Sequence, residues 1–167
     1  MSEGGRTGAV KQLNRKSEVP GEHGLPKTPV ASARVTRAGF EGDFNRYRRE
    51  EKHDDPDMAV LLLPLEVISA LNGEGWPIRP GDLGENLTTS GIPNDAFRPS
   101  QKVRVGKVLL EVSKPCTPCD NLFLLPYVGK MRGPEFLRTT LGRRGWYCRV
   151  LEEGVVRTGD RIELVSA

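Results

Sequence analysis

The sequence has no long hydrophobic segment. Its longest apolar run, residues 59–65, is interrupted by Pro64, whereas a helix that spans a bilayer needs about 20 consecutive apolar residues. The opening residues, MSEGGRTGAV, lack the apolar stretch of a secretory signal peptide. The sequence therefore predicts a cytoplasmic protein with no membrane partner.

Cysteine and aromatic residues are also scarce. The three cysteines form no disulfide framework, and in a reducing compartment they are expected to be free thiols. Aromatic residues make up 6% of the chain and do not alternate with basic residues, as they do in proteins that stack single-stranded nucleic acid. The net charge is only +3, so we expect no nucleic-acid partner.

A chain of 167 residues is long enough for one domain with its own hydrophobic core. We expect a flexible tail at residues 1–7 and a single domain over residues 8–167. Glycine and proline divide the chain into short segments, several of which have the apolar, β-branched content of strands. The predicted strands are residues 8–13, 30–36, 59–63, 84–89, 102–112, 146–151 and 161–165.

Helical patterns are fewer. Residues 64–72 carry apolar side chains at helical spacing and end at an Asn-Gly pair. A second helix is predicted over residues 134–141, with Pro134 at its first position. The predicted strand 102–112 contains a kink at Gly106 and is a strand or a hairpin. Together these patterns predict a mainly β (α+β) fold, a barrel-like sheet with the helices packed outside it.

The segment KPCTPCDNL holds Cys116 and Cys119 around a Thr-Pro pair. A redox dithiol needs its first cysteine at a helix N-terminus, but the residues that follow form a poor amphipathic helix. A zinc site needs four ligands, and the remaining cysteine and the two histidines show no zinc-like spacing. Both patterns are thus incomplete, and two further alternatives stay open beside them: structural cysteines without chemistry, and one thiolate that acts as a nucleophile or binds a soft metal.

Five segments resemble, in order, the MOSC domain, a family named after the C-terminal domain of molybdenum-cofactor sulfurases that also occurs as small stand-alone bacterial proteins. They are HGLPKTPV, GFEGDFNRYRREEKHDDPDMAVLLLP, GDLGENLTTSGI, KPCTPCDNL and RRGWYCRVLEEGVVRTGD. The resemblance covers roughly residues 8–165. It implies a MOSC-type β-barrel-like domain with a few peripheral helices.

The resemblance also implies a molybdenum site. In molybdenum-dependent members a cysteine of the phrase P-x-x-P-C-x-x-L binds the metal, and the matching residue is Cys119, which would be both metal ligand and catalytic residue. Cys116 lies at a position where relatives often carry a basic residue, and it is not expected to bind the metal. The cofactor would be molybdopterin, the organic part of the molybdenum cofactor. Candidates to bind it are Lys27, Arg46, Arg48, Asn86, Thr88, Thr89 and Arg144.

Each of these candidates has a structural alternative. The basic run 46–49 and Arg144 belong to clusters that are also typical of a solvated surface, and Asn86 with its threonines suits turn hydrogen bonds. Glu85 is expected to be either an acid close to the site or an exposed carboxylate. The segment His53-Asp54-Asp55 departs from the family's His-Gly-Gly phrase, which puts an anion-binding role there in doubt. We expect Lys27, the basic run, GENLTT and the Cys119 loop to meet at one pocket.

The activity that the resemblance implies is reduction of N-hydroxylated small molecules, such as amidoximes, N-hydroxylated bases and hydroxylamines. The chain has no flavin, haem or iron–sulfur motif, so a separate redox partner protein is implied. Two alternatives stay open. One is a sulfur-carrier or cofactor-handling module with a persulfide on Cys119, and the other is a cofactor-free enzyme that acts on C–S bonds. The sequence does not predict the oligomeric state.

Overall fold

The computed structural model of the chain describes residues 6–165. Its main sheet closes on itself because β1 pairs with β6 along one edge and with β11 along the other. The barrel strands, in order around the ring, are β1 (Thr7–Arg15), β11 (Arg161–Val165), β7 (Lys102–Val105), β8 (Val108–Pro115), β9 (Trp146–Glu152), β5 (Val60–Pro64) and β6 (Leu87–Ser90).

The ring of seven strands contains one parallel pair, β5 with β6. Neighbouring antiparallel strands alternate in direction, so a closed ring with an odd number of strands needs at least one parallel pair. A parallel pair needs a long crossover connection, usually with a helix. The chain between β5 and β6 supplies this crossover with α2 (Leu65–Gly73).

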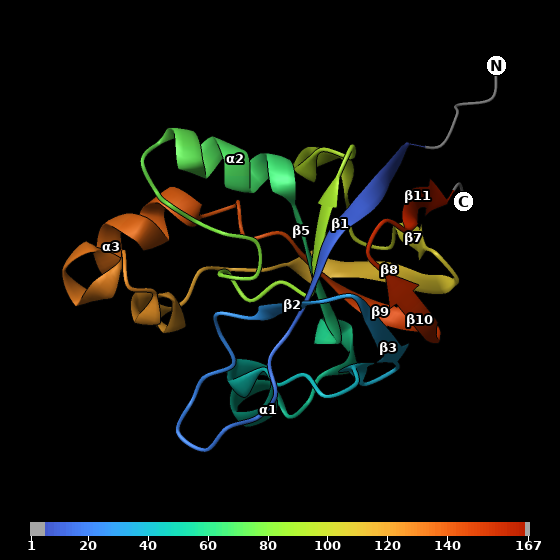
Figure 1. Ribbon diagram of the computed structural model, residues 1–167, viewed down its shortest axis with the longest axis horizontal. Coiled ribbons are helices and arrows are strands. Elements are labelled where there is room, and N and C mark those ends of the chain that lie inside the picture. Colours follow the sequence, from blue (N-terminus) through green and yellow to red (C-terminus); the bar gives the residue numbers. More distant parts are fainter. Residues whose placement is uncertain (1–5, 166–167) are drawn as a thin grey trace.

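The remaining elements lie around this barrel (Figure 1). A small antiparallel sheet runs in the order β10, β3, β4, and β2 pairs with the far end of β1. These elements and the other helices are β2 (Thr28–Val30), β3 (Ser32–Thr36), β4 (Gly39–Phe40), β10 (Gly154–Arg157), α1 (Arg46–Lys52) and α3 (Gly129–Thr140), with short 3₁₀ turns at Pro56–Met58, Asn94–Ala96 and Asp120–Leu124.

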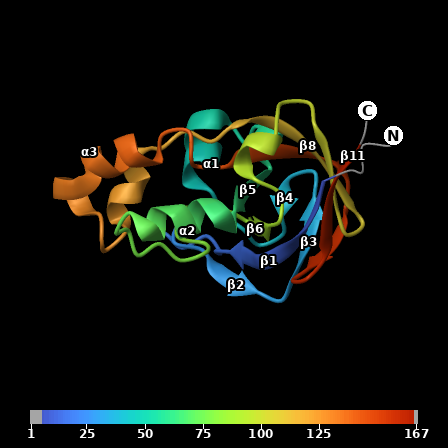
Figure 2. The ribbon, with the colours of Figure 1, turned by 90° about the horizontal axis from the view of Figure 1, so that it is seen from above.

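Two large hydrophobic cores hold the elements together, beside a small cluster of Met58, Leu61, Cys116 and Tyr147. One fills the barrel, and the other lies between β5, α2, α3 and the 3₁₀ turn that follows Cys119. Both views show α2 and α3 on the same side of the barrel (Figures 1 and 2). The strand β5 separates the two cores, so all five of its residues are buried. This explains its uninterrupted apolar sequence, VLLLP, since a strand covered on both faces needs no polar alternation.

The predicted mainly β fold with external helices is confirmed, but several details differ. The prediction that Pro134 begins a helix is wrong, because α3 begins at Gly129 and contains Pro134. The predicted strand 102–112 is the hairpin of β7 and β8, which turns at Gly106. Most of the predicted tail lies outside the described residues, and Thr7 is the first residue of β1. Across residues 6–165, no helix combines the length and apolar character that crossing a bilayer requires.

Three elements were not predicted: β4, β10 and α1. The helix α1 has the sequence RYRREEK and contains no buried residue, so it lacks the apolar periodicity from which helices are predicted. It is instead fixed at its ends. The Asn45 side chain accepts a hydrogen bond from the N–H of Arg48 at the N-terminus, and His53 adopts a left-handed conformation at the C-terminus.

Candidate functional site

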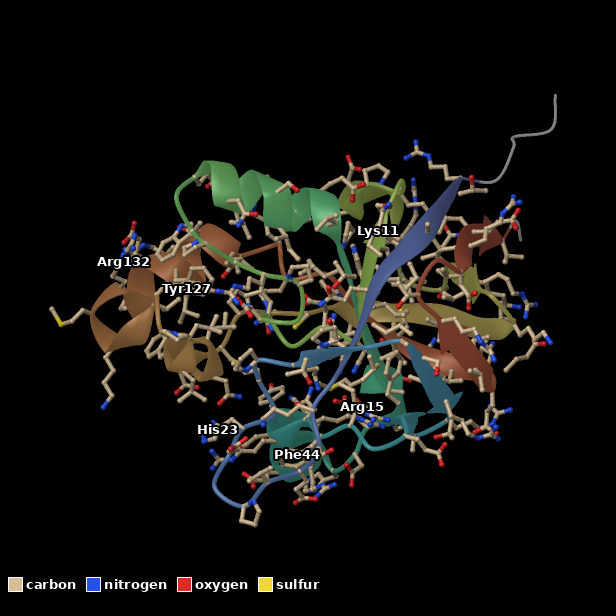
Figure 3. The ribbon with its side chains drawn as sticks, viewed as in Figure 1. Lys11, Arg15, His23, Phe44, Tyr127 and Arg132 are labelled. Carbon is tan, nitrogen blue, oxygen red and sulfur yellow. The ribbon has the colours of Figure 1, made fainter. Side chains whose placement is uncertain are left out.

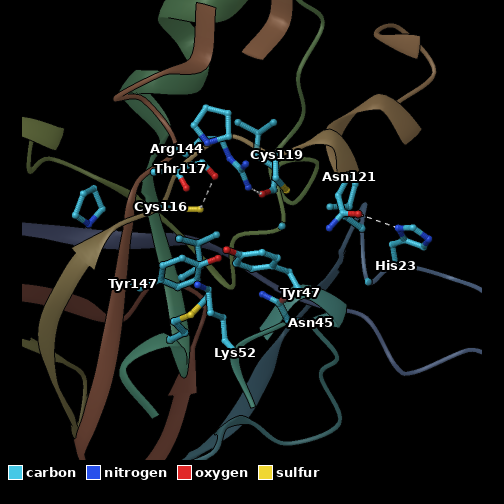
Figure 4. A pocket seen from close by; sticks show the side chains of 18 of the residues that line it. His23, Asn45, Tyr47, Lys52, Cys116, Thr117, Cys119, Asn121, Arg144 and Tyr147 are labelled. Atoms are coloured by element: carbon cyan, nitrogen blue, oxygen red, sulfur yellow. Dashed lines mark hydrogen bonds between the residues drawn. The ribbon is translucent and has the colours of Figure 1, made fainter. Parts of the chain in front are cut away.

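The candidate site lies where β8 ends and its neighbour β9 begins. Pro115 is paired with Trp146, so the loop that leaves β8 and the loop that enters β9 lie side by side. The N–H of Cys116 donates to the carbonyl of Gly145 at 2.9 Å, which joins the two loops. These loops carry Cys119 and Arg144, and they line a cavity of about 320 Å³, here called the first cavity (Figure 4).

Other segments complete the walls of the first cavity. They are the loop that carries His23 and Lys27, the helix α1 with Tyr47 and Lys52, the residues Met58 and Leu61, and the Leu83-Gly84 turn before β6. His23 lies in the loop beside α1 (Figure 3). The volume is at the lower end of the range found for small-molecule sites, about 300–1,000 Å³. Segments far apart in the sequence thus meet at the Cys119 loop.

The three cysteines are free and differ in their surroundings. Cys148 is fully buried in the barrel core, and burial raises the pKa of its thiol to about 12, so it remains protonated. Cys116 is 3% exposed and packs against Met58, Leu61 and Tyr147 like a small apolar side chain. Cys119 is partly exposed. Among these thiols, Cys119 is the one most accessible to a ligand in the first cavity.

Neither cysteine of the loop begins an α-helix. Cys119 precedes the 3₁₀ turn Asp120–Leu124, so the aligned amides that lower the pKa of a redox dithiol are not present there. Within residues 6–165, no group of three His, Cys, Asp or Glu side chains lies close enough together to hold a metal ion. A metal bound by Cys119 would therefore need further ligands from a cofactor.

Arg144 is the most unusual cation in the site. Its side chain is buried, and its Nη2 donates to the carbonyl of Leu83 at 2.6 Å, but Nε and Nη1 have no partner among the described residues. Burial lowers the pKa of Arg144, but Cys116, Tyr147 and Cys119 raise it by more, so the guanidinium stays charged. Buried donors without a partner are costly, and Arg144 lines the first cavity, which makes it a candidate to bind an anion there.

Lys27 also lines the first cavity, but its ammonium group is already used. It forms an ion pair with Asp43 at 2.7 Å and donates to the carbonyl of Phe44 at 3.1 Å. Asp43 also accepts hydrogen bonds from the Asn86 side chain at 2.9 Å and from the N–H of Lys16 at 3.0 Å. Lys27 and Asn86 thus anchor Asp43, and Asn86 does not line the first cavity.

The predicted arginines of α1 lie apart from one another. Arg46 pairs with Glu50 at 2.8 Å and contacts His23. It lines a second cavity of about 450 Å³ that adjoins the first. Arg48 points elsewhere and donates to backbone carbonyls on both sides of α1, those of Ala38, Asp54 and Asp55. The cofactor role expected for Arg48 therefore has no support from its position.

The GENLTT segment is buried behind the first cavity. Thr88 accepts a hydrogen bond from the Asn14 side chain at 3.0 Å, and Thr88 and Thr89 are fully buried in β6 without lining the cavity. Glu85 is also fully buried, so the expectation of an exposed carboxylate is wrong. Burial raises the pKa of Glu85 to about 8, although its Oε1 accepts a hydrogen bond from the N–H of Gly81. Glu85 is therefore predominantly a neutral acid at pH 7.

Several lining residues were not predicted from the sequence. Lys114 lies two residues before Cys116, and its Nζ lies 3.3 Å from Oδ2 of Asp55. Asp55, part of the acidic departure from the family phrase, thus lies close to a cation of the site. Tyr147 follows Arg144 closely in sequence and is buried in the cavity wall, and burial with the neighbouring Cys116 raises its pKa. Lys114 and Tyr147 could have been found from the sequence, because they lie within the family motifs KPCTPCDNL and RRGWYCRVLEEGVVRTGD.

Comparison with known proteins identifies relatives over most of the chain. The MOSC domain model matches residues 49–163. The chain is 33% identical to the uncharacterized protein YflK of Bacillus subtilis over 152 residues, which span 87% of this chain and 64% of that protein. It is 30% identical to the protein YiiM of Escherichia coli over 138 residues, 79% of this chain and 58% of that protein. The chain thus spans less than two thirds of both relatives.

Solved structures show the same fold. The YuaD protein of Bacillus subtilis superposes with a TM-score of 0.82 at 21% identity, and the match covers 98% of each chain. YiiM of Geobacillus stearothermophilus superposes with a TM-score of 0.72 at 28% identity, over 95% of this chain and 75% of that one. The barrel and its external helices are therefore a shared architecture.

Proposed function

The chain belongs to the MOSC domain family, and on this premise we propose that it binds a molybdenum cofactor through Cys119 and reduces N-hydroxylated small molecules. The observation that carries the proposal is the pairing of an accessible thiol, Cys119, with the buried and partly unsatisfied guanidinium of Arg144 in one cavity. A thiolate is a suitable ligand for a soft metal, and a guanidinium is a suitable partner for a phosphate.

The charges of the first cavity support an anionic ligand. Among the described residues, the side chains that line it include four cations and no carboxylate; the cations are Lys27, Lys52, Lys114 and Arg144. Lys27 is neutralised by Asp43 behind the wall, and Lys114 lies near Asp55. Arg144 keeps two donors without a partner. A molybdopterin, which carries a phosphate and a dithiolene, fits this set of donors.

The protein side of the chemistry is binding and orientation. The cofactor would supply the two-electron redox step. Cys119 would hold the metal, Arg144 and Lys52 would bind anionic oxygens, and the apolar wall of Met58 and Leu61 would limit access of water. Electrons would come from a separate redox partner protein, since the sequence has no motif for a second cofactor.

Metal analysis and paired cysteine variants test the proposal. The protein would be produced in a host that synthesises the molybdenum cofactor, and assayed for molybdenum and for benzamidoxime reduction with reduced methyl viologen. We expect about one molybdenum per chain, no activity in Cys119→Ala, and most of the activity in Cys116→Ala. Arg144→Gln should lower the molybdenum content, because the buried donors are lost.

A different result would favour another function. Equal loss of activity in both cysteine variants, with no molybdenum in the wild type, would support dithiol chemistry. A persulfide on Cys119, detected by mass spectrometry in protein without molybdenum, would support the sulfur-carrier alternative. Activity on C–S bonds in protein that has neither molybdenum nor a persulfide on Cys119 would support the cofactor-free enzyme.

A further inference from the structure

Cys119 lies at the junction of two cavities. The first and second cavities share four wall residues, His23, Tyr47, Cys119 and Asn121. The second cavity is lined by one arginine and by three carboxylates, those of Glu50, Glu51 and Asp120. It therefore lacks the cation surplus that an anionic cofactor needs, whereas the first cavity has that surplus. If the cofactor occupies the first cavity, the second is the free approach to Cys119.

The shared wall contains a fixed amide group. Nδ1 of His23 lies 2.9 Å from Oδ1 of Asn121. An amide oxygen only accepts, so Nδ1 of His23 is the donor in this hydrogen bond. Nη1 of Arg46 lies close to both ring nitrogens of His23 and holds the ring from its other side. The contact with His23 thus turns the oxygen of the Asn121 amide toward the His23 ring.

This orientation leaves the Asn121 amide nitrogen free. Figure 4 shows the dashed hydrogen bond on the side of Asn121 that faces His23, with the amide nitrogen on the other side, toward the interior of the cavity. Among the described residues, the hydrogen bond of the Asn121 side chain is the one between its Oδ1 and Nδ1 of His23. Asn121 and Cys119 both line the first and the second cavity, so the amide nitrogen of Asn121 lies in the wall that the two cavities share.

We infer that the second cavity binds the N-hydroxylated substrate and that Asn121, held by His23, donates a hydrogen bond to the oxygen of its N–O bond. This inference rests on the proposed function. In the overall reaction, R–NH–OH takes up two electrons and two protons, the N–O bond breaks, and R–NH₂ and water are released. Negative charge builds up on the oxygen as the bond breaks, so a fixed N–H donor stabilises that stage most. His23 acts through Asn121 and is a positioning residue.

The test is a double-mutant cycle on His23 and Asn121. Asn121→Ala removes the donor, and His23→Leu removes the group that orients it. His23→Asn is the matched control, because an asparagine amide nitrogen lies at about the place of Nδ1 and can still donate to Asn121. Each variant would be loaded with cofactor, its molybdenum content measured, and its kcat and KM determined for benzamidoxime with reduced methyl viologen.

We expect Asn121→Ala to lower kcat/KM about tenfold or more, mostly in kcat, as loss of a donor to a developing oxyanion does. His23→Leu should lower it severalfold, and His23→Asn should restore most of that loss. His23→Leu should have no further effect in the Asn121→Ala background, since His23 acts only through Asn121. Molybdenum content should equal that of the wild type in all variants, which a role in cofactor binding would not predict.

Two results would overturn the inference while the proposed function stands. One is a molybdenum-loaded, active Asn121→Ala variant with unchanged kcat/KM. The other is an additive effect of the two substitutions, which would mean that His23 acts independently of Asn121. A wild type without molybdenum and without activity would instead overturn the proposed function, and the substrate role of Asn121 with it.

Discussion

The buried carboxyl of Glu85 makes a quantitative prediction about pH and stability. Burial raises its pKa from 4.5 to about 8 in the folded chain, and Arg144 and the Gly81 N–H offset only part of this effect. Between these pH values the folded chain holds a proton that the unfolded chain has lost. Stability therefore decreases as pH rises. The contribution is fully present below pH 4.5 and is lost as pH rises through about 8.

The magnitude follows from the size of the pKa change. At about 1.4 kcal/mol for each pH unit, a change from 4.5 to about 8 corresponds to about 5 kcal/mol, as an order of magnitude. Glu85→Gln replaces the neutral acid with a neutral amide of the same shape. The amide oxygen can still accept from Gly81, and the variant has no proton to lose. We expect the wild type to lose several kcal/mol relative to Glu85→Gln between pH 5 and pH 8.

The assay is urea unfolding followed by tryptophan fluorescence, at several pH values, for the wild type and Glu85→Gln. The difference in the free energy of unfolding between the two proteins isolates Glu85 from the other titrating groups. A difference that stays constant from pH 5 to pH 8 would refute the argument. A variant that is less stable than the wild type by the same amount at every pH would indicate an ionised Glu85 paired with Arg144.

Three further predictions concern other features. Asp43→Ala should destabilise the fold by about 3–5 kcal/mol in urea unfolding, because it leaves the Lys27 ammonium buried without its partner; an effect below about 1 kcal/mol would contradict this. Gly133→Ala should cost about 1–3 kcal/mol, since a Cβ there would overlap the Phe123 ring, and Phe123→Ala should relieve this cost. In the native protein, iodoacetamide should label Cys119 first and leave Cys148 unlabelled, as mass spectrometry of the digested protein can show; early labelling of Cys148 would mean that the barrel core opens.

The barrel could be predicted because its signals are local. Short apolar, β-branched segments between glycines and prolines mark most of the strands, and the order of the motifs gave the family. The helix α1 could not be found in this way, because RYRREEK has no buried residue. Its existence depends on capping by Asn45 and on the hydrogen bonds of the Arg48 side chain with carbonyls outside the helix, those of Ala38 and Asp55, which become visible only in the folded chain.

The site was harder to predict because its charges depend on partners that are distant in sequence. Lys27 and Asn86 are polar residues in family motifs, but both are bound to Asp43. Arg143 and Arg144 are adjacent, and the sequence does not show that their partners differ. Arg143 is partly exposed and pairs with Glu74, whereas Arg144 is buried beside the cysteines. The sequence identifies the pair as basic, and only the fold distinguishes the surface arginine from the buried one.

This difference decides how the site can bind an anion. A cation that already has a carboxylate partner gains little from a ligand, because the existing pair must be disrupted or shared. Lys27 with Asp43 and Arg46 with Glu50 are in that position. Arg144 differs, since two of its buried donors have no partner among the described residues. The binding free energy of an anionic group in the first cavity should therefore depend more on Arg144 than on Lys27, whose ammonium group is already paired.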